Sequence, residues 1–405
     1  MSKPLVIISR NPDSYLSGHS IFSWQLSEFL AGNAGIPVVH VTHSSREGSR
    51  HSVRITPPVA ARRYRRIEVQ YEPMAKVPHS LSSCVVADSI DGILREYPNG
   101  VRGVLAVSPL SYLADVLNVC RKPSIPVVSL LRGTDTLQLA RPWGETWSGR
   151  RYRRALERCD GIFTVSSWLK DLARKIDLPV NGVVAPVTFH PFSSETLESE
   201  ARSLEEKMFP GNRPNRGRLV AFAGRMAVEK GALKVAHVLD ALLKREPSVR
   251  AVMAGSGSER DRVGQVLAHW ISAGRAWAGP LSFPEVLALS SRTDLMLMGS
   301  GLEEEDNFTE AISSSSVTFA SRGTPVLYRG GPRSGGIREA VGEENRVWCE
   351  SLASHECWSE AIRDLFRDEA RYRRISSQNR AAGKAFEIHT VLSPLLTCFG
   401  IRLAC

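Results

Sequence analysis

Short runs of apolar residues alternate along the chain with longer segments in which apolar residues recur every three to four positions. The first half opens with the apolar run 5–9, a turn-rich stretch and the periodic segment IFSWQLSEFLA. Apolar runs rich in β-branched residues predict strands, and the periodic segments predict helices. Further strands are predicted near 37–43, 103–108, 125–131, 160–166 and 182–187. Strands that alternate with helices predict βαβ units and a parallel sheet.

The alternation stops between 192 and 217 and then restarts. This interval is polar and charged, which predicts a short helix followed by a connector rich in Pro, Gly, Asn and Arg. The strands predicted after it are 219–224, 249–255, 294–299 and 324–330. We therefore expect a Rossmann-like domain at 1–191, a linker at 192–217, a second Rossmann-like domain at 218–387 and a C-terminal segment at 388–405. Doubly wound sheets bind ligands at the carboxyl ends of their strands, so we expect the active site in a cleft between facing domains.

Composition agrees with a globular protein. The 405 residues are 42% hydrophobic and 23% charged, which disfavours extended disorder and favours two to three domains. No apolar run approaches the roughly 18 residues of a membrane-spanning helix, and the first apolar run is too short for a secretory signal, so we expect a cytoplasmic protein. The seven cysteines are scattered without a CxxC pair, which predicts reduced thiols and neither a disulfide framework nor a zinc site.

The net charge of +10 favours anionic partners, whether sugar nucleotides, phospholipids or nucleic acid. Nucleic acid is not expected, because no aromatic stacking platform accompanies the arginines. The arginine tracts at 61–66, 149–158 and 370–380 are open to two interpretations. They are either solvated helix faces or a peripheral contact with acidic lipids at the inner face of the membrane.

The most informative segment is LVAFAGRMAVEKGALKV. Its predicted strand ends in Gly224 and is followed by Arg225 and Lys230 just before a predicted helix. Two cations at the carboxyl end of a strand, beside the free N–H groups of a helix start, form a clamp for a diphosphate. The alternative is two surface cations, because the segment lacks the GxxxxGK[ST] and GxGxxG patterns.

Four segments, GRMAVEKG, VRAVMAGSGSER, WAGPLSFPEVLALSSRTDLMLMGS and SRGTPV, follow one another in an order that resembles the family 4 retaining glycosyltransferases. DSYLSGH, LLRGTDTL, DGIFTVSSWLKDL and VVAPVTFHPF match that family more loosely. The resemblance implies an α/β protein of GT-B architecture, with two Rossmann-like domains facing a central cleft. It also implies that the N-terminal domain binds the acceptor, that the C-terminal domain binds the sugar nucleotide, and that 388–405 packs back on the N-terminal domain.

The resemblance assigns roles to single residues. Arg225 and Lys230 would bind the donor diphosphate and stabilise it as the leaving group. His19 is a candidate acceptor contact, with an ordinary exposed loop histidine as the alternative. The donor-binding candidates implied in this way are Gly18, Gly224, Gly255, Gly257, Trp277 and Ala278.

The family's C-terminal signature, two glutamates separated by seven residues before a GTPV-like stretch, is altered in this chain. Counting back from GTPV puts Thr318 at the second glutamate and Glu310 at the first. The segment Asp306-Asn307-Phe308 matches the loop instead, which makes Asp306 the preferred acidic residue, Glu310 its competitor, and Asn307 and Phe308 donor contacts. The alternative for the acidic run at 303–306 is a solvated loop. A Thr hydroxyl makes a weaker contact than a carboxylate, so the nucleotide stays open.

Arg132 lies in RGTD, where many members of the resembling family carry a histidine that faces the donor sugar. At the carboxyl end of a predicted strand, Arg132 is suited to hydrogen-bond sugar hydroxyls or an acidic group.

These features predict a retaining hexosyltransferase that moves a sugar from a UDP- or GDP-linked donor to a small-molecule or glycan acceptor. Its setting would be specialised-metabolite or cell-surface glycan biosynthesis. No metal or other cofactor is expected, because no histidine stands at ligand spacing from the acidic run and the resembling family generally needs none. One alternative is transfer to a thiol or an aminocyclitol. Another is a catalytically silent sugar-nucleotide binder or a membrane-docked scaffold.

Overall fold

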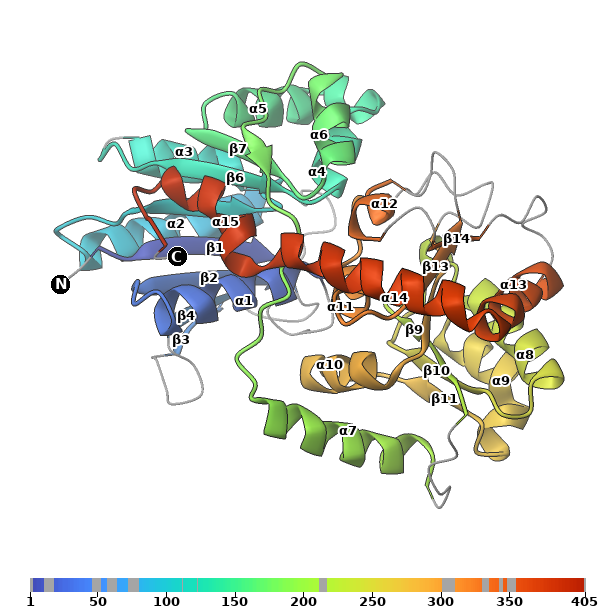
Figure 1. Ribbon diagram of the computed structural model, residues 1–405. Helices are drawn as coiled ribbons and strands as arrows, with labels where there is room; N and C mark the ends of the chain where they lie inside the picture. The colour runs from blue at the N-terminus through green and yellow to red at the C-terminus, as the bar shows by residue number, and fades with distance from the viewer. Residues whose placement is uncertain are drawn as a thin grey trace. The chain divides into compact units, whose positions relative to one another are not determined.

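A computed structural model of the chain is drawn in Figure 1. It describes residues 3–10, 18–45, 52–56, 64–71, 80–110, 112–121, 123–210, 217–300, 310–329, 335–341, 345–347 and 355–403. The chain forms two compact units, one of Met1–Pro191 with Ile388–Cys405 and one of Phe192–Glu387.

The first unit is built on an eight-stranded sheet, as far as the described residues show, in the order β3-β4-β2-β1-β5-β6-β7-β8. All neighbouring strands are parallel except the antiparallel pair β3 and β4. The strands are β1 (Leu5–Arg10), β2 (Val38–Ser45), β3 (Ser52–Thr56), β4 (Arg65–Tyr71), β5 (Gly103–Val107), β6 (Val127–Leu131), β7 (Gly161–Thr164) and β8 (Gly182–Val183).

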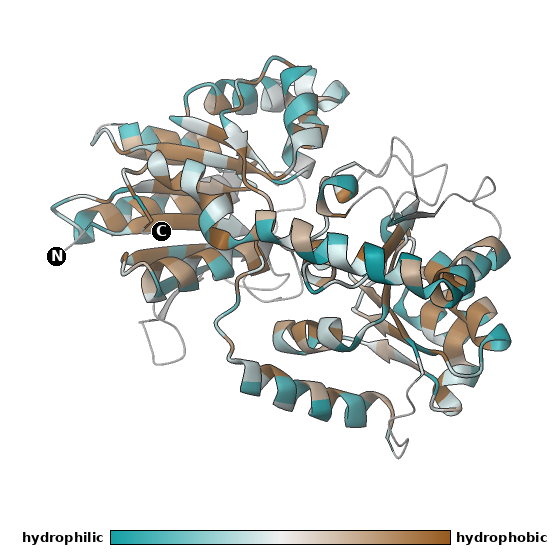
Figure 2. Ribbon diagram, viewed as in Figure 1, coloured by the Kyte–Doolittle hydropathy of each residue, from teal (hydrophilic) through white to brown (hydrophobic). Residues whose placement is uncertain are grey.

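Helices cover this sheet. They are α1 (Gly18–Gly32), α2 (Ser80–Glu96), α3 (Leu113–Arg121), α4 (Thr134–Leu139), α5 (Trp147–Leu156), α6 (Ser167–Arg174) and α15 (Ile388–Thr397), with the short helix η1 (Pro142–Glu145). Alternate strand residues point to opposite faces, so Val6 and Ile8 join the buried cluster that includes Val86 of α2 and Val116 of α3. Figure 2 shows the inner strands as mostly hydrophobic ribbons.

The end of the chain completes the first unit. Five side chains of α15 are buried: Ile388, Val391, Leu392, Leu395 and Leu396. The ring of Phe399 lies so close to Gly103 of β5 that a Cβ on this glycine would overlap it. The Sγ of Cys398 would lie 3.4 Å from a Cβ on Gly161 of β7. Residues 388–399 therefore cover part of one face of a sheet whose strands are made near the start of the chain.

The second unit has a sheet in the order β11-β10-β9-β12-β13-β14, six strands among the residues that the structure describes, with every neighbouring pair parallel. The strands are β9 (Leu219–Ala223), β10 (Arg250–Ala254), β11 (Ala276–Gly279), β12 (Leu295–Met298), β13 (Val326–Arg329) and β14 (Arg346–Val347). Its helices are α7 (Ser194–Met208), α8 (Ala232–Arg245), α9 (Arg260–Ser272), α10 (Phe283–Arg292), α11 (Ser314–Ser321), α12 (Ile337–Ala340), α13 (His355–Arg367) and α14 (Glu369–Gly383), with the short helices η2 (Val228–Lys230) and η5 (Lys384–Phe386). The two parallel α/β sheets predicted from the sequence are confirmed.

Three findings differ from the sequence-based expectations. The short helix expected within the linker 192–217 is the fifteen-residue helix α7, which packs on α10 and belongs to the second unit instead of to a linker. The described end of the arginine tract at 61–66 is not a helix face, because Arg65 and Arg66 belong to β4. Cys357 of α13 is disulfide-bonded, so the expectation of seven reduced thiols is wrong. Scattered spacing along a sequence says little about a pairing that the fold creates.

No helix in the described part of the chain is long and apolar enough to cross a lipid bilayer.

Candidate functional site

The centre of the second sheet contains a topological switch point. Strand β9 lies between β10 and β12, so the connections that leave the carboxyl ends of β9 and β12 run to opposite sides. Open α/β sheets bind their ligands at such a point, outside the carboxyl ends of the strands. The motif GRMAVEKG forms the β9–α8 connection and therefore occupies the ligand-binding edge of this sheet.

The start of α8 is open to an anion. Its N-cap is Gly231, which offers no side-chain cap, and its first turn contains no acidic residue. The first N–H groups of a helix have no partner within the helix, and the helix dipole favours negative charge there. This fourteen-residue helix begins directly after Lys230. A cation and an uncapped helix start are thus neighbours in one short connection.

Gly231 is required by a close approach of two backbones. Its φ of 60° lies in the left-handed region, and a Cβ there would overlap the carbonyl oxygen of Gly299, just beyond β12. In return, a Cβ on Gly299 would stand 2.6 Å from the carbonyl oxygen of Lys230. The β9–α8 connection is therefore packed onto the end of β12.

Lys230 is held by Glu310. The Lys230 ammonium donates a short hydrogen bond to Glu310 Oε2, which also accepts one from Ser300 Oγ at 2.9 Å. The side chain of Glu310 is 9% exposed and that of Lys230 is 20% exposed. A pair this far from water interacts more strongly than a surface pair, and the charge left behind when one partner is removed is costly.

Arg225 is more accessible than Lys230. Its side chain is 61% exposed, and Nη2 forms an ion pair with Glu229 Oε1 at 2.5 Å. Both cations therefore lie in the connection after β9, each next to a carboxylate. Pairing of exposed charges is weak, so a stronger anion can readily replace Glu229 as the partner of the Arg225 guanidinium.

Gly255 and Gly257 follow β10 and meet the same connection. Their φ values are 151° and 148°, and a Cβ on Gly255 would overlap the carbonyl oxygen of Gly224. A Cβ on Gly257 would overlap that of Met226, whose N–H donates to Ser256 O at 2.8 Å. Glycines bring the loops after β9 and β10 into direct backbone contact.

The remaining predicted donor residues of the second unit have other partners. Trp277 of β11 packs over Gly279, and the Lys207 ammonium of α7 lies 5.8 Å from its ring centroid. Ala278 follows it in the same strand. Thr318 lies in α11, where its hydroxyl donates to Ser314 O at 2.9 Å. That hydroxyl proton is used within the helix itself.

The predicted residues of the first unit lie at the carboxyl ends of β1 and β6. Gly18 begins α1, and the side chain of His19 lies outside the described residues. Arg132 follows β6, and its guanidinium carbon lies 5.1 Å from the ring centroid of Phe22 in α1. Its N–H donates to Asp135 Oδ2 at 3.1 Å.

Asp306, Asn307 and Phe308 lie outside the described residues. Within the described ranges, no group of three or more His, Cys, Asp or Glu side chains is arranged to hold a metal ion.

Sequence reasoning missed several side chains that contact the predicted ones. The spacing of Glu229 four residues after Arg225 signals an ion pair along one helical turn, so it was open to prediction. Ser300 and Phe22 gave no signal, because their contacts with Glu310 and Arg132 depend on how distant segments meet.

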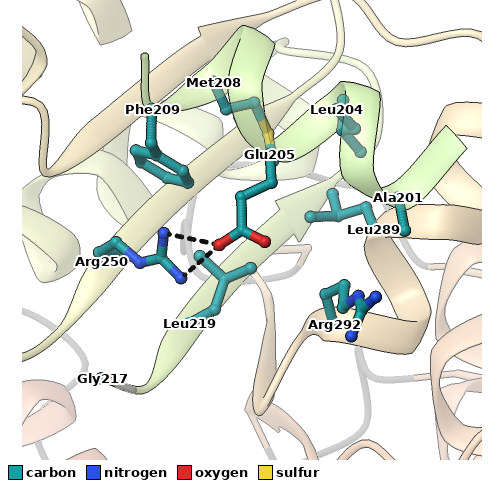
Figure 3. Close-up of a pocket in the computed structure, with 10 residues that line it drawn as sticks. All are labelled: Ala201, Leu204, Glu205, Met208, Phe209, Gly217, Leu219, Arg250, Leu289 and Arg292. Carbon is teal, nitrogen blue, oxygen red and sulfur yellow. Dashed lines mark hydrogen bonds and ion pairs between the residues drawn. The ribbon is translucent and has the colours of Figure 1, made fainter. Parts of the chain in front are cut away.

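A cavity of about 330 Å³ in the second unit lies elsewhere, between α7, α10 and the sheet (Figure 3). Leu219 and Arg250, the first residues of β9 and β10, line it, and Arg250 Nη1 pairs with Glu205 Oε1 of α7 at 3.1 Å. It therefore opens at the amino ends of the strands, and we do not count it as part of the candidate site.

Comparison with known proteins agrees with this geometry. Residues 203–382 match the family described as glycosyl transferases group 1. No curated protein matches the chain in sequence.

Solved structures share the whole fold. Sucrose-phosphate synthase from Thermosynechococcus elongatus superposes with a TM-score of 0.69 at 17% identity, covering 98% of this chain and 97% of that chain. A glycosyltransferase from Rickettsia africae gives 0.63 at 13% identity, covering 98% of each chain. HepE from Anabaena, in complex with UDP and glucose, gives 0.63 at 14% identity, covering 99% of this chain and 100% of that chain.

The matched residues include the β9–α8 connection, the glycine turn after β10 and Glu310, and the two sheets correspond to the two Rossmann-like domains of the GT-B fold. Residues 203–382 are therefore similar to the glycosyl transferases of group 1, and the chain as a whole has the GT-B fold.

Proposed function

We propose that the second unit binds a nucleoside diphosphate sugar, with Arg225, Lys230 and the first turn of α8 around the diphosphate. The observation that carries the proposal is the position of both cations in one connection at the switch point, directly before an uncapped helix start. Cations and helix N–H groups are the partners that phosphate oxygens take in proteins.

Transfer then rests on stabilising the leaving group. The bond between the anomeric carbon and the diphosphate oxygen breaks, and the new bond forms to the acceptor oxygen on the same face, so configuration is retained. The acceptor proton passes to an oxygen of the departing diphosphate. Preorganised positive charge where negative charge develops accounts for much of the rate gain in such reactions.

Glu310 acts as the counter-ion of Lys230 while the donor is absent. Its carboxylate neutralises the charge of a half-buried ammonium, which would be costly to keep away from water without a counter-ion. When a diphosphate arrives, the ammonium exchanges one anion for another of higher charge. Glu310 keeps its hydrogen bond from Ser300 and remains fixed beside the donor.

UDP is the first candidate for the nucleotide, because HepE, which shares the fold, was solved with UDP and glucose. The hydroxyl of Thr318 donates to its own helix, so the ribose takes its main contacts from other groups. We further propose that the first unit binds the acceptor, a hydroxyl of a small molecule or a glycan.

A thermal-shift screen of the full chain against UDP, GDP, ADP and TDP tests donor binding. A ligand at 100 times its Kd adds about 2.7 kcal/mol to the free energy of unfolding. We expect UDP to give the largest shift, and Arg225→Gln and Lys230→Gln each to reduce it.

Lys244→Gln is the matched control, because Lys244 forms an exposed ion pair on α8 with Asp240 at 2.7 Å. A full UDP shift in both clamp variants would contradict the proposed diphosphate site. Nucleotide binding without sugar transfer or donor hydrolysis would instead indicate a silent binder.

A further inference from the structure

Arg132 is half-buried, and two nitrogens of its guanidinium group are shielded from solvent. Its Nε and Nη1 are closed off from solvent, and neither has a hydrogen-bond partner among the described residues. The guanidinium carbon of Arg132 lies 5.1 Å from the ring centroid of Phe22, which is 1% exposed. A ring face attracts a cation, but it does not accept the directed hydrogen bonds that two N–H groups offer.

This arrangement costs stability in the free protein. Burial lowers the pKa of Arg132 to about 10, and the carboxylate of Asp135 opposes that shift. Asp135 Oδ2 accepts a hydrogen bond from the backbone N–H of Arg132. Buried polar groups in proteins nearly always have partners, so two shielded nitrogens without a partner in the described part of the chain call for a specific reason. A bound anion is one such reason, because it would accept hydrogen bonds from both nitrogens.

The position of Arg132 is that of a ligand contact. In the first sheet, β1 lies between β2 and β5, and β6 follows β5, so the switch point is beside β1. Arg132 extends from the carboxyl end of β6 to Phe22, in the second turn of the helix that follows β1. The first turn of this fifteen-residue helix contains no acidic residue. An arginine and a helix start thus converge where open sheets bind ligands.

We propose that Arg132 binds an anionic substituent, a carboxylate or a phosphate monoester, of the substrate that enters the first unit. This anion is separate from the diphosphate that Arg225 and Lys230 bind in the second unit. It belongs to the acceptor or to the transferred sugar, and it pairs with both unpartnered nitrogens. The proposal rests on the proposed function only for the statement that the ligand is a sugar or a glycosyl acceptor.

Calorimetric titration of the full chain tests the anion site without turnover. The first probe is inorganic phosphate. The affinity for glucose 6-phosphate is then compared with that for glucose, which tests whether the acceptor carries the anion. UDP-glucuronate against UDP-glucose tests the transferred sugar. We expect one charged member of these pairs to bind more tightly than its neutral partner, and the pair that shows the difference identifies the source of the anion.

The variant Arg132→Gln should weaken binding of that charged probe about 10- to 100-fold, the effect of losing a charge-assisted bidentate contact. It should leave the neutral probe and UDP unchanged. Arg132→Lys should give an intermediate loss, because an ammonium lacks the planar fork of donors. Arg154→Gln, an exposed arginine of the same unit, should change nothing.

Equal affinity of wild type and Arg132→Gln for every charged probe, or no charge preference in wild type, would overturn the proposal. An equal loss for charged and neutral probes would also overturn it, since that result indicates a structural role. UDP binding that fails while phosphate binding depends on Arg132 would contradict the proposed function and leave the anion site standing.

Discussion

At the scale of single residues, the proposed chemistry of the second unit depends most on the ion pair of Lys230 and Glu310. The pair is joined by a short hydrogen bond and lies mostly out of water. Lys230 lies within the motif of the β9–α8 connection and was predicted from it. Glu310 is 80 residues away, and its contact depends on the course of the chain after β12, which no local pattern reveals.

Removing the Lys230 ammonium should reduce turnover far more than stability. For Lys230→Gln we expect kcat to fall by roughly 10² to 10³, the size of effect seen when one preorganised charge stabiliser is lost. The measurement is nucleotide release with the donor identified by the thermal-shift screen. Lys244→Gln serves again as the control and should keep wild-type kcat. Wild-type kcat in Lys230→Gln would remove this residue from the leaving-group site.

His355 should make the second unit sensitive to acid. It stacks on His237 of α8, with ring centroids 5.0 Å apart. Burial, then the nearby His237, lowers the pKa of His355 below its ordinary 6.5, with Lys234 adding to the shift and Glu356 opposing it. The unfolded chain therefore binds a proton at a pH where the folded chain does not. Stability is full above pH 6.5 and decreases as the pH falls below it.

Urea unfolding at a series of pH values measures this slope. His355→Asn should flatten the decline below about pH 6.5. The exposed His269 of α9 offers the control, and His269→Asn should leave the decline in place. A decline that is equally steep without His355 would assign the acid sensitivity to other groups.

At the scale of elements, the loops after β9 and β10 are joined through glycines. Gly255→Ala places a methyl group against the carbonyl of Gly224 and requires a φ near 151°, which L-residues rarely adopt. We expect a loss of about 1–3 kcal/mol in unfolding free energy and weaker nucleotide binding, because the β9–α8 connection must shift.

Gly264→Ala is the matched control for that variant. Gly264 lies in α9, and a Cβ there would meet nothing within 4 Å. Alanine in a helix interior should raise stability by about 0.5–1 kcal/mol and leave nucleotide binding unchanged. The two variants should therefore shift in opposite directions in chemical denaturation. Equal behaviour of both would mean that the turn after β10 tolerates a side chain.

The elements that the sequence predicted best are those whose pattern is local. The apolar runs that became β1, β5, β6, β9 and β10 are buried on both faces, so each reads as a strand by itself. β3 and β4 were missed because their sequences, SVRIT and RRIEVQY, carry charges and read as an arginine tract. Their strand conformation comes from pairing with each other and with β2, which is a tertiary effect.

At the scale of the whole molecule, the first unit consists of two separate chain segments. Removing residues 388–405 would uncover the part of the sheet near Gly103 and take away the buried side chains of α15. We expect the first unit of such a truncated chain to unfold or aggregate, since the lost burial exceeds the usual margin of stability. The second unit has its own core and should still bind nucleotide.

Hydrogen exchange with and without UDP measures this outcome unit by unit. In the truncated chain, protection should disappear from β1, β5 and β6 and persist in β9 and β10. A chain shortened only after Leu403 should behave as wild type. Persistent protection of the first sheet without α15 would show that the first unit folds without this helix.

The position of α15 near the end of the chain also affects how the first unit folds during synthesis. Residues 192–387 emerge between the two halves of the first unit. At 5–20 residues per second, the nascent N-terminal sheet stays without α15 for roughly 10 to 40 s, with part of an apolar face accessible to chaperones. The first unit therefore becomes complete only after the second unit has been synthesised.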